Sequence, residues 1–282
     1  MIVESSLTET RSIVRAARQH GRSVGCIPTM GALHQGHVSL IEIARQQCDF
    51  VVVTIFVNPT QFGPNEDFTQ YPRTLAADLE MCHAAGADLI FTPPVTTMYA
   101  GSAQTIVRVT KLAQVLEGAH RPGHFDGVST VVAKLLNVTE PGRAYFGQKD
   151  FQQQLIVRQM CVDLDLPVEI ITCPIIREAD GLAMSSRNRY LSVVERKQAS
   201  QLFQTLKLAE NLAENSALPP PEIARQMLDY LKSVDGIDVQ YAVIADALTL
   251  ELLTDRSNSA VALLAVKVGS TRLIDNQILR FR

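Results

Sequence analysis

The sequence predicts an α/β protein, a Rossmann-like doubly wound parallel sheet followed by a second, smaller α+β domain. Up to about residue 171, strand-like and helix-like patterns alternate, as they do in parallel α/β sheets. Residues 50–57, FVVVTIFV, form the continuous apolar, β-branched run of a strand that is covered on both faces. After about residue 176 the order changes, and helices are followed by three closely spaced strands.

The first domain is expected to span residues 1–176 and to open with a helix capped by Thr8 that ends at Gly21. Apolar periodicity predicts further helices around residues 37–44, 74–85, 128–136 and from 151 onward. Short apolar runs predict strands at residues 24–27, 50–57, 88–91, 105–109, 143–146 and 168–171. Ligands of such sheets bind outside the carboxyl ends of the strands.

The second domain is expected to span residues 177–282. A loop rich in Ser and Arg leads into helices near residues 193–213 and 221–233, which a Leu-Pro-Pro-Pro turn separates. Strands are expected at residues 237–244, 260–267 and 271–275.

Composition narrows the class of protein. The 282 residues are 46% hydrophobic and 20% charged, which is ordinary for a soluble globular protein of two domains. A net charge of −3 without a long basic run argues against nucleic-acid binding. The five cysteines are scattered without a C-x-x-C pair, and the N-terminus lacks a signal-peptide layout. We therefore expect a cytoplasmic protein with no membrane-spanning segment.

The stretch PTMGALHQGHVSL, residues 28–40, carries the first candidate site residues. It reads as a strand, a glycine-containing turn and a helix start, where free backbone N–H groups attract phosphate. His34 and His37 are spaced so that both can face that anion and stabilise charge as pyrophosphate leaves. For this stretch alone, two exposed histidines or half a zinc site remain alternatives.

The stretch READGLAMSSRNRYLS, residues 177–192, carries the second set. Ser185, Ser186 and Arg187 combine hydroxyl donors with a planar cation, which suits triphosphate oxygens. Alone, it would more often be a polar linker in which Ser192 caps the next helix.

The pairing of these two stretches resembles the H-I-G-H and K-M-S-K-S motifs of the nucleotidyltransferase superfamily. Six stretches in order narrow the resemblance to the pantoate–β-alanine ligase (pantothenate synthetase) family. They are PTMGALHQGH (28–37), FVNPTQF (56–62), YPRT (71–74), EGAHRPGHFDGV (117–128), FGQKDFQQ (146–153) and READGLAMSSRN (177–188).

The resemblance implies ATP-dependent condensation of (R)-pantoate with β-alanine through a pantoyl adenylate. The products would be pantothenate, AMP and pyrophosphate, in the biosynthesis of pantothenate and coenzyme A. It also implies Mg²⁺ with ATP, a homodimer, and closure of the second domain over the active site.

The resemblance also implies roles for single residues. His37 would donate a proton, while His34 and Lys149 would contact phosphate. Gln61 and Gln153 would bind pantoate, with Gln61 also next to β-alanine. The implied ATP site consists of Met30, Gly31, Ala32, Leu33, His34, Gln35, Gly36, His37, Gly147, Gln148, Lys149, Asp150, Ile176, Met184, Ser185, Ser186 and Arg187.

The chemistry of these side chains agrees with such roles. Amide groups suit the hydroxyls and the carboxylate of pantoate, and Lys149 offers a mobile positive charge. Taken singly, Gln61, Gln153 and Lys149 would more often be ordinary surface residues. Gln148 departs from the family pattern, which more commonly has Glu at that position, and removes one negative charge beside the phosphates.

Two other features are less specific. His120 and His124 could be a zinc pair, but the Pro and Gly between them disfavour a helical ligand geometry and no third ligand is evident. We expect this run to form a loop before a helix, with Arg121 near the substrates. Asp78 is a candidate for indirect Mg²⁺ binding through water, with a capping or surface role as the alternative.

Three rival functions stay open at this point. A nucleotidyltransferase that leaves AMP on a phosphorylated product would share both phosphate-binding stretches, although Gln61 and Gln153 suit a neutral diol better. An aminoacyl-tRNA synthetase fragment fits poorly with the acidic balance. A nucleotide sensor without activity would bind ATP without turnover.

Overall fold

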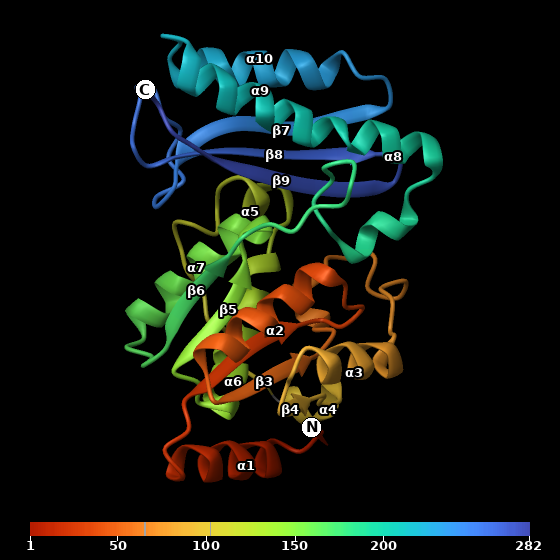
Figure 1. Cartoon of the computed structure of the whole chain (residues 1–282), viewed down its shortest axis with the longest axis vertical. Helices are drawn as coiled ribbons and strands as arrows, with labels where there is room; N and C mark the ends of the chain where they lie inside the picture. The colour runs from red at the N-terminus through yellow and green to blue at the C-terminus, as the bar shows by residue number, and fades with distance from the viewer. Residues whose placement is uncertain (65, 102) are drawn as a thin grey trace. The chain divides into compact units, whose positions relative to one another are not determined.

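The computed structural model describes residues 1–64, 66–101 and 103–282, and the chain divides into two compact units (Figure 1). The first unit consists of Met1–Gln148 and Gln152–Pro174. The second consists of Lys149–Phe151 and Ile175–Arg282. Residues 149–151, 175 and 176, which the sequence placed in the first domain, thus group with the second unit.

The first unit contains a six-stranded parallel sheet with the order β1-β4-β3-β2-β5-β6, which confirms the predicted fold class. After β2 the chain adds β3 and β4 on one side, and it later adds β5 and β6 on the other. The topological switch point, where ligands of such sheets bind, therefore lies between β2 and β5. The strands are β1 (Ile2–Glu4), β2 (Val24–Thr29), β3 (Phe50–Ile55), β4 (Leu89–Phe91), β5 (Arg143–Gly147) and β6 (Glu169–Cys173).

Helices cover both faces of this sheet. Side chains of α2 and α3 pack against Val51 and Val53 of β3, while α1 packs against Val52 on the other face. The helices α6 and α7 pack together against β5 and β6. The helices are α1 (Leu7–Gln19), α2 (Gln35–Gln47), α3 (Leu75–Ala84), α4 (Val95–Met98), α5 (Glu117–His120), α6 (His124–Thr139) and α7 (Phe151–Asp163), with 3₁₀ turns η1 (Pro59–Gln61) and η2 (Gln148–Asp150).

Covering both faces explains why every residue of β3 except Thr54 is apolar. All six of its residues are buried, with alternate side chains entering different cores. Each fully buried valine contributes roughly 1.5–3 kcal/mol relative to an exposed one. A polar residue at any of these positions would lose that contribution and bury an unpaired group.

The second unit has a three-stranded antiparallel sheet with the order β7-β8-β9. Figure 1 shows α9 and α10 along one face of this sheet, where Leu202, Leu206 and Ile223 join the strand side chains in one core. The elements are η3 (Ser186–Tyr190), α8 (Val193–Ala199), α9 (Gln201–Asn215), α10 (Pro220–Lys232), β7 (Ile237–Asp246), β8 (Ala260–Val268) and β9 (Thr271–Leu279).

The structure corrects several expected elements. The N-cap of α1 is Ser6 rather than Thr8, and its side chain accepts from the N–H of Glu9 at 3.3 Å. The expected strand at 105–109 is wrong, because this segment is irregular and the N–H of Val107 donates to the Thr130 hydroxyl at 3.0 Å. The expected helix 193–213 is two helices, α8 and α9, and the short edge strand β1 was not predicted. In the described ranges, no helix has both the length and the apolarity needed to cross a membrane.

Candidate functional site

Polar loops follow β2, β3 and β5, the strands nearest the switch point. Residues 30–34 follow β2, and Asn58 with η1 follows β3. The two loops touch, since the Gln61 Nε2 donates to the Met30 Sδ at 2.7 Å. Gly147 ends β5 in the same sheet. The first unit thus brings Met30, Gln61 and Gly147 to the edge where parallel sheets bind ligands.

The two histidines form a reciprocal cap at the start of α2. The Nδ1 of His34 accepts from the N–H of Gly36 at 3.1 Å, and the Nδ1 of His37 accepts from the N–H of His34 at 3.3 Å. Their ring centroids lie 4.1 Å apart. Because each Nδ1 is the acceptor, a neutral ring carries its hydrogen on Nε2. Both imidazoles are thereby set as Nε2–H donors.

Most backbone N–H groups of this loop already have partners, which corrects the expectation that free N–H groups would attract phosphate. Those that have partners within the chain belong to Gly31, Ala32, Leu33, His34, Gly36 and His37. Phosphate binding by this loop would therefore depend on the imidazoles more than on these N–H groups.

Asp78 supplies two of those partners. One carboxylate oxygen accepts from the N–H of Ala32 at 3.0 Å, and the other accepts from Leu33 at 2.8 Å and from the Thr74 hydroxyl at 3.1 Å. The side chain is only 2% exposed, so the surface role considered for it is wrong. Its engaged oxygens also fit poorly with holding a hydrated Mg²⁺. In the part of the chain that the structure describes, no group of three or more His, Cys, Asp or Glu side chains is placed to hold a metal ion.

The orientation of the Gln61 amide follows from Asn58. The Oδ1 of Asn58 accepts from the N–H of Thr60, and its Nδ2 donates to the carbonyl of Gly127 at 3.1 Å. Since an N–H only donates and a carbonyl only accepts, the Asn58 amide can lie only one way round. Its Nδ2 also donates to the Gln61 Oε1 at 3.2 Å. The oxygen of Gln61 is therefore engaged, and its NH₂ group lies on the Met30 side as a donor.

A partly buried network holds the Gln61 backbone. Arg121 pairs with Glu66 at 2.6 Å and donates to the Nε2 of His124 at 3.0 Å. Since arginine only donates, the His124 Nδ1 carries the hydrogen and donates to the Gln61 carbonyl at 2.7 Å. Burial, with the Arg121 charge second, lowers the pKa of His124 to about 4. Both His124 nitrogens are engaged, which leaves none for zinc.

In the segment after β5, some side chains are buried and hold the fold together, while others are exposed enough to bind a substrate. Gln148, Lys149 and Asp150 form η2. The neighbours of Gln153 are buried, and the Gln152 amide donates to the carbonyls of residues 112 and 115. Gln153 itself is partly exposed, as a substrate-binding side chain must be.

The Ser- and Arg-rich loop is ordered by local bonds within the second unit. The N–H of Met184 donates to the Ile176 carbonyl at 2.9 Å, and Ser185 caps η3 by accepting from the N–H of Arg187 at 3.3 Å. Ser192 caps α8 in a reciprocal box with Glu195, as expected from the sequence. Ile176 and residues 184–187 thus share one local structure within the second unit.

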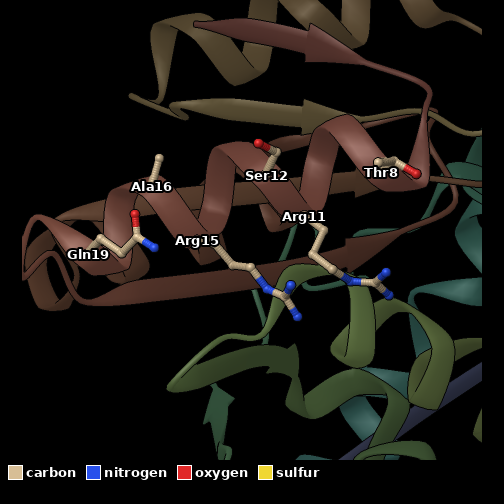
Figure 2. Close-up of a pocket in the computed structure, with 6 residues that line it drawn as sticks. All are labelled: Thr8, Arg11, Ser12, Arg15, Ala16 and Gln19. Atoms are coloured by element: carbon tan, nitrogen blue, oxygen red, sulfur yellow. The ribbon is translucent and has the colours of Figure 1, made fainter.

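A separate hollow of about 450 Å³ lies on α1 (Figure 2). Figure 2 shows Arg11 and Arg15 pointing to the same side of the helix, and Arg15 pairs with Glu140 at 2.7 Å. Its lining comes from one helix alone: Thr8, Arg11, Ser12, Arg15, Ala16 and Gln19. Arg11 and Arg15 already face the Glu140 carboxylate. The side chains of this one helix do not converge on a point where a ligand would be held.

Sequence reasoning missed several residues of the site. Asn58 had a usable signal, because Asn before Pro is typical of the N-cap of a short helix. Gly127 lies inside α6, where glycine is unfavourable without a packing reason. The backbone groups that Asp78 and His124 hold, in residues 32, 33 and 61, lie 45 or more residues away from them, and no local pattern predicts those bonds.

The chain is similar to known proteins over nearly its whole length. The family described as "Pantoate-beta-alanine ligase" matches residues 2–278. A pantothenate synthetase of Acetivibrio thermocellus is 48% identical over 278 residues, which cover 99% of each chain. One from Moorella thermoacetica is 49% identical over 274 residues, or 97% of each chain.

Solved structures show the same relationship. Pantothenate synthetase from Thermus thermophilus superposes with a TM-score of 0.94 at 43% identity, covering 99% of each chain. A pantoate–β-alanine ligase of Francisella tularensis, described as complexed with "Beta-gamma ATP and Beta-alanine", superposes with a TM-score of 0.81 at 34% identity. It covers 99% of this chain and 97% of its own. The chain therefore belongs to the pantoate–β-alanine ligase family of enzymes.

Proposed function

We propose that this chain joins (R)-pantoate to β-alanine at the expense of ATP, through a pantoyl adenylate, giving pantothenate, AMP and pyrophosphate. The observation that carries the proposal is the Gln61 amide, whose NH₂ group Asn58 turns toward the Met30 side of the switch point. The H-x-G-H loop follows the neighbouring strand β2, and its two imidazoles act as hydrogen-bond donors. The Gln61 amide, which can bind an acid, and the histidines, which can bind phosphate, thus follow the neighbouring strands β3 and β2.

In the first step, a carboxylate oxygen of pantoate attacks the α-phosphate of ATP in line, and pyrophosphate leaves. Gln61 and Gln153 hold pantoate through its hydroxyl and carboxylate oxygens. The Nε2–H groups of His34 and His37, with the Lys149 ammonium, stabilise the charge that builds up on the phosphate oxygens. Mg²⁺ bound to ATP would neutralise part of the triphosphate charge.

In the second step, the β-alanine amine attacks the acyl carbon of the adenylate, the amide forms and AMP leaves. Gln61 lies next to both acids in this scheme. We assign the remaining ATP contacts to residues 30–37, 147–150, 176 and 184–187 on the strength of the family resemblance. The same resemblance supports a homodimer, and five buried, unpaired cysteines are in keeping with a reducing cytoplasm.

Exchange of labelled pyrophosphate into ATP tests the proposal. The exchange should require pantoate but not β-alanine, because it reports adenylate formation alone. Addition of β-alanine should then release free AMP. Exchange without any acid, or with amino acids in place of pantoate, would overturn the proposal, and AMP retained on a phosphorylated product would favour a nucleotidyltransferase.

Substitution of the charge-stabilising groups gives a sharper test. His37→Ala and Lys149→Ala should each lower the rate of adenylate formation by roughly 10² or more, if each stabilises charge in the transition state. The measurement is a single-turnover rate, with His83→Ala and Lys232→Ala, both at exposed helical positions, as matched controls. Near-normal rates for both site variants would show that the stabilisation comes from other groups.

A further inference from the structure

The turn that leads into the H-x-G-H helix has an unusual backbone. Gly31 and Ala32 both have positive φ, +79° and +50°. For an alanine, the left-handed region costs roughly 1–2 kcal/mol. Successive backbone N–H groups of a turn can point into one concavity that attracts an anion. The turn therefore needs an acceptor to hold it.

Asp78 fills that concavity from the first turn of α3. Its two oxygens accept from the N–H groups of Ala32 and Leu33 at 3.0 and 2.8 Å. Thr74 orients the carboxylate through its hydroxyl at 3.1 Å, and its carbonyl accepts from the Asp78 N–H at 2.9 Å. A carboxylate that is 2% exposed and accepts three bonds is a fixed part of the loop's frame.

Gly31 also packs closely against the Asp78 carboxylate and against Ile55 of β3. A Cβ added to Gly31 would lie 3.0 Å from the Asp78 Oδ2 and 3.1 Å from a methyl of Ile55. The turn is thus held between β3 and α3. His34, the N-cap of α2, is the next residue after Leu33. Any shift of the turn therefore moves the two imidazoles.

We propose that Asp78 is a positioning residue, which fixes the 30–33 turn and so sets where His34 and His37 meet the reacting phosphate. This inference rests on the proposed adenylate-forming function. It assigns the carboxylate to the protein's own backbone, in place of the indirect Mg²⁺ contact that the sequence suggested. Because the histidines act in the transition state, the loss should appear in kcat more than in KM.

Asp78→Asn is the decisive variant, since it replaces one of the two acceptor oxygens with an NH₂ group, which donates and cannot accept from a backbone N–H group. We expect kcat for pantoate-dependent pyrophosphate exchange to fall on the order of 10- to 100-fold, as for a small misplacement of catalytic groups. The KM for ATP and the Mg²⁺ concentration at half-maximal rate should stay within twofold of the parent chain. Circular dichroism and thermal unfolding show whether the variant is folded at the assay temperature.

Each outcome decides the proposal. An unchanged kcat in a folded Asp78→Asn protein would overturn it, and so would activity that is restored by excess Mg²⁺. If Asp78→Asn does not fold, Thr74→Val replaces it, because it removes only the bond that orients the carboxylate. A folded Thr74→Val protein with full kcat would then overturn the proposal. Absence of pantoate-dependent exchange in the parent chain would instead contradict the proposed function itself.

Discussion

Gly127→Ala tests how tightly α6 seats the loop that carries Gln61. A Cβ built on Gly127 would lie 2.3 Å from the Thr60 carbonyl oxygen and 2.7 Å from the Gln61 nitrogen. Both are backbone atoms, which no change of rotamer can move aside. The Gly127 carbonyl also accepts from Asn58, which orients the Gln61 amide. The added methyl group must therefore displace the helix or the loop.

Two effects of opposite sign determine the change in stability. Alanine in a helix interior is about 1 kcal/mol more favourable than glycine. Overpacking typically costs about 1–3 kcal/mol, and here ordinary contact would require a backbone shift of roughly 1 Å. We expect the overpacking cost to exceed the gain in helix propensity, so that the melting temperature falls by roughly 2–8 °C. A shift of this size should also lower kcat/KM for pantoate by on the order of 10- to 100-fold.

The assays are thermal unfolding and steady-state kinetics with pantoate and ATP varied in turn. Ser129→Ala, two residues further along α6, is the matched control. Ser129 is fully buried, and its hydroxyl has no partner among the described residues, so removing the hydroxyl should leave both readouts unharmed. If Gly127→Ala raised stability by about 1 kcal/mol with normal pantoate kinetics, the argument from close packing would be refuted.

Two predictions concern buried charge. Because the pKa of His124 is lowered from 6.5 to about 4, the unfolded chain binds its proton first, and stability falls as pH drops from about 6.5 to 4. His124→Asn, which keeps a donor near the Gln61 carbonyl, should flatten that decline in pH-dependent unfolding. In the second unit, Arg177→Met should destabilise by about 3–5 kcal/mol, because Asp275 is left as an unpaired buried carboxylate. Denaturant unfolding measures that loss.

Controls separate these effects from general damage. His83→Asn, at an exposed position on α3, is the matched control for the substitution itself. An equally steep decline in His124→Asn would assign the acid sensitivity to other groups. For the ion pair, a double variant, Arg177→Met with Asp275→Asn, should regain part of the lost stability, since burial raises the pKa of Asp275 and penalises its charge. No recovery would show that packing, and not charge, carries the Arg177 effect.

Local patterns in the sequence predicted those strands, turns and helix starts that depend on residues close together in the chain. The run at 50–57 predicted β3, because a strand buried on both faces is apolar at nearly every position, here at all but Thr54. The glycine and histidine spacing at 31–37 predicted a turn before a helix, and Ser192 predicted the start of α8. Six motifs in order were enough to indicate the family, which the comparisons confirm.

Only the tertiary structure decided the features that depend on distant partners. Residues 105–109 have the composition of a strand but pair with no strand among the described residues, and strand structure requires a partner. Asp78 reaches Ala32 and His124 reaches Gln61 across 46 and 63 residues, so nothing beside them in sequence announces those bonds. The chain shows which side chains have phosphate- or acid-binding chemistry, whereas burial and hydrogen bonding decide which of them face a ligand and which hold the loops in place.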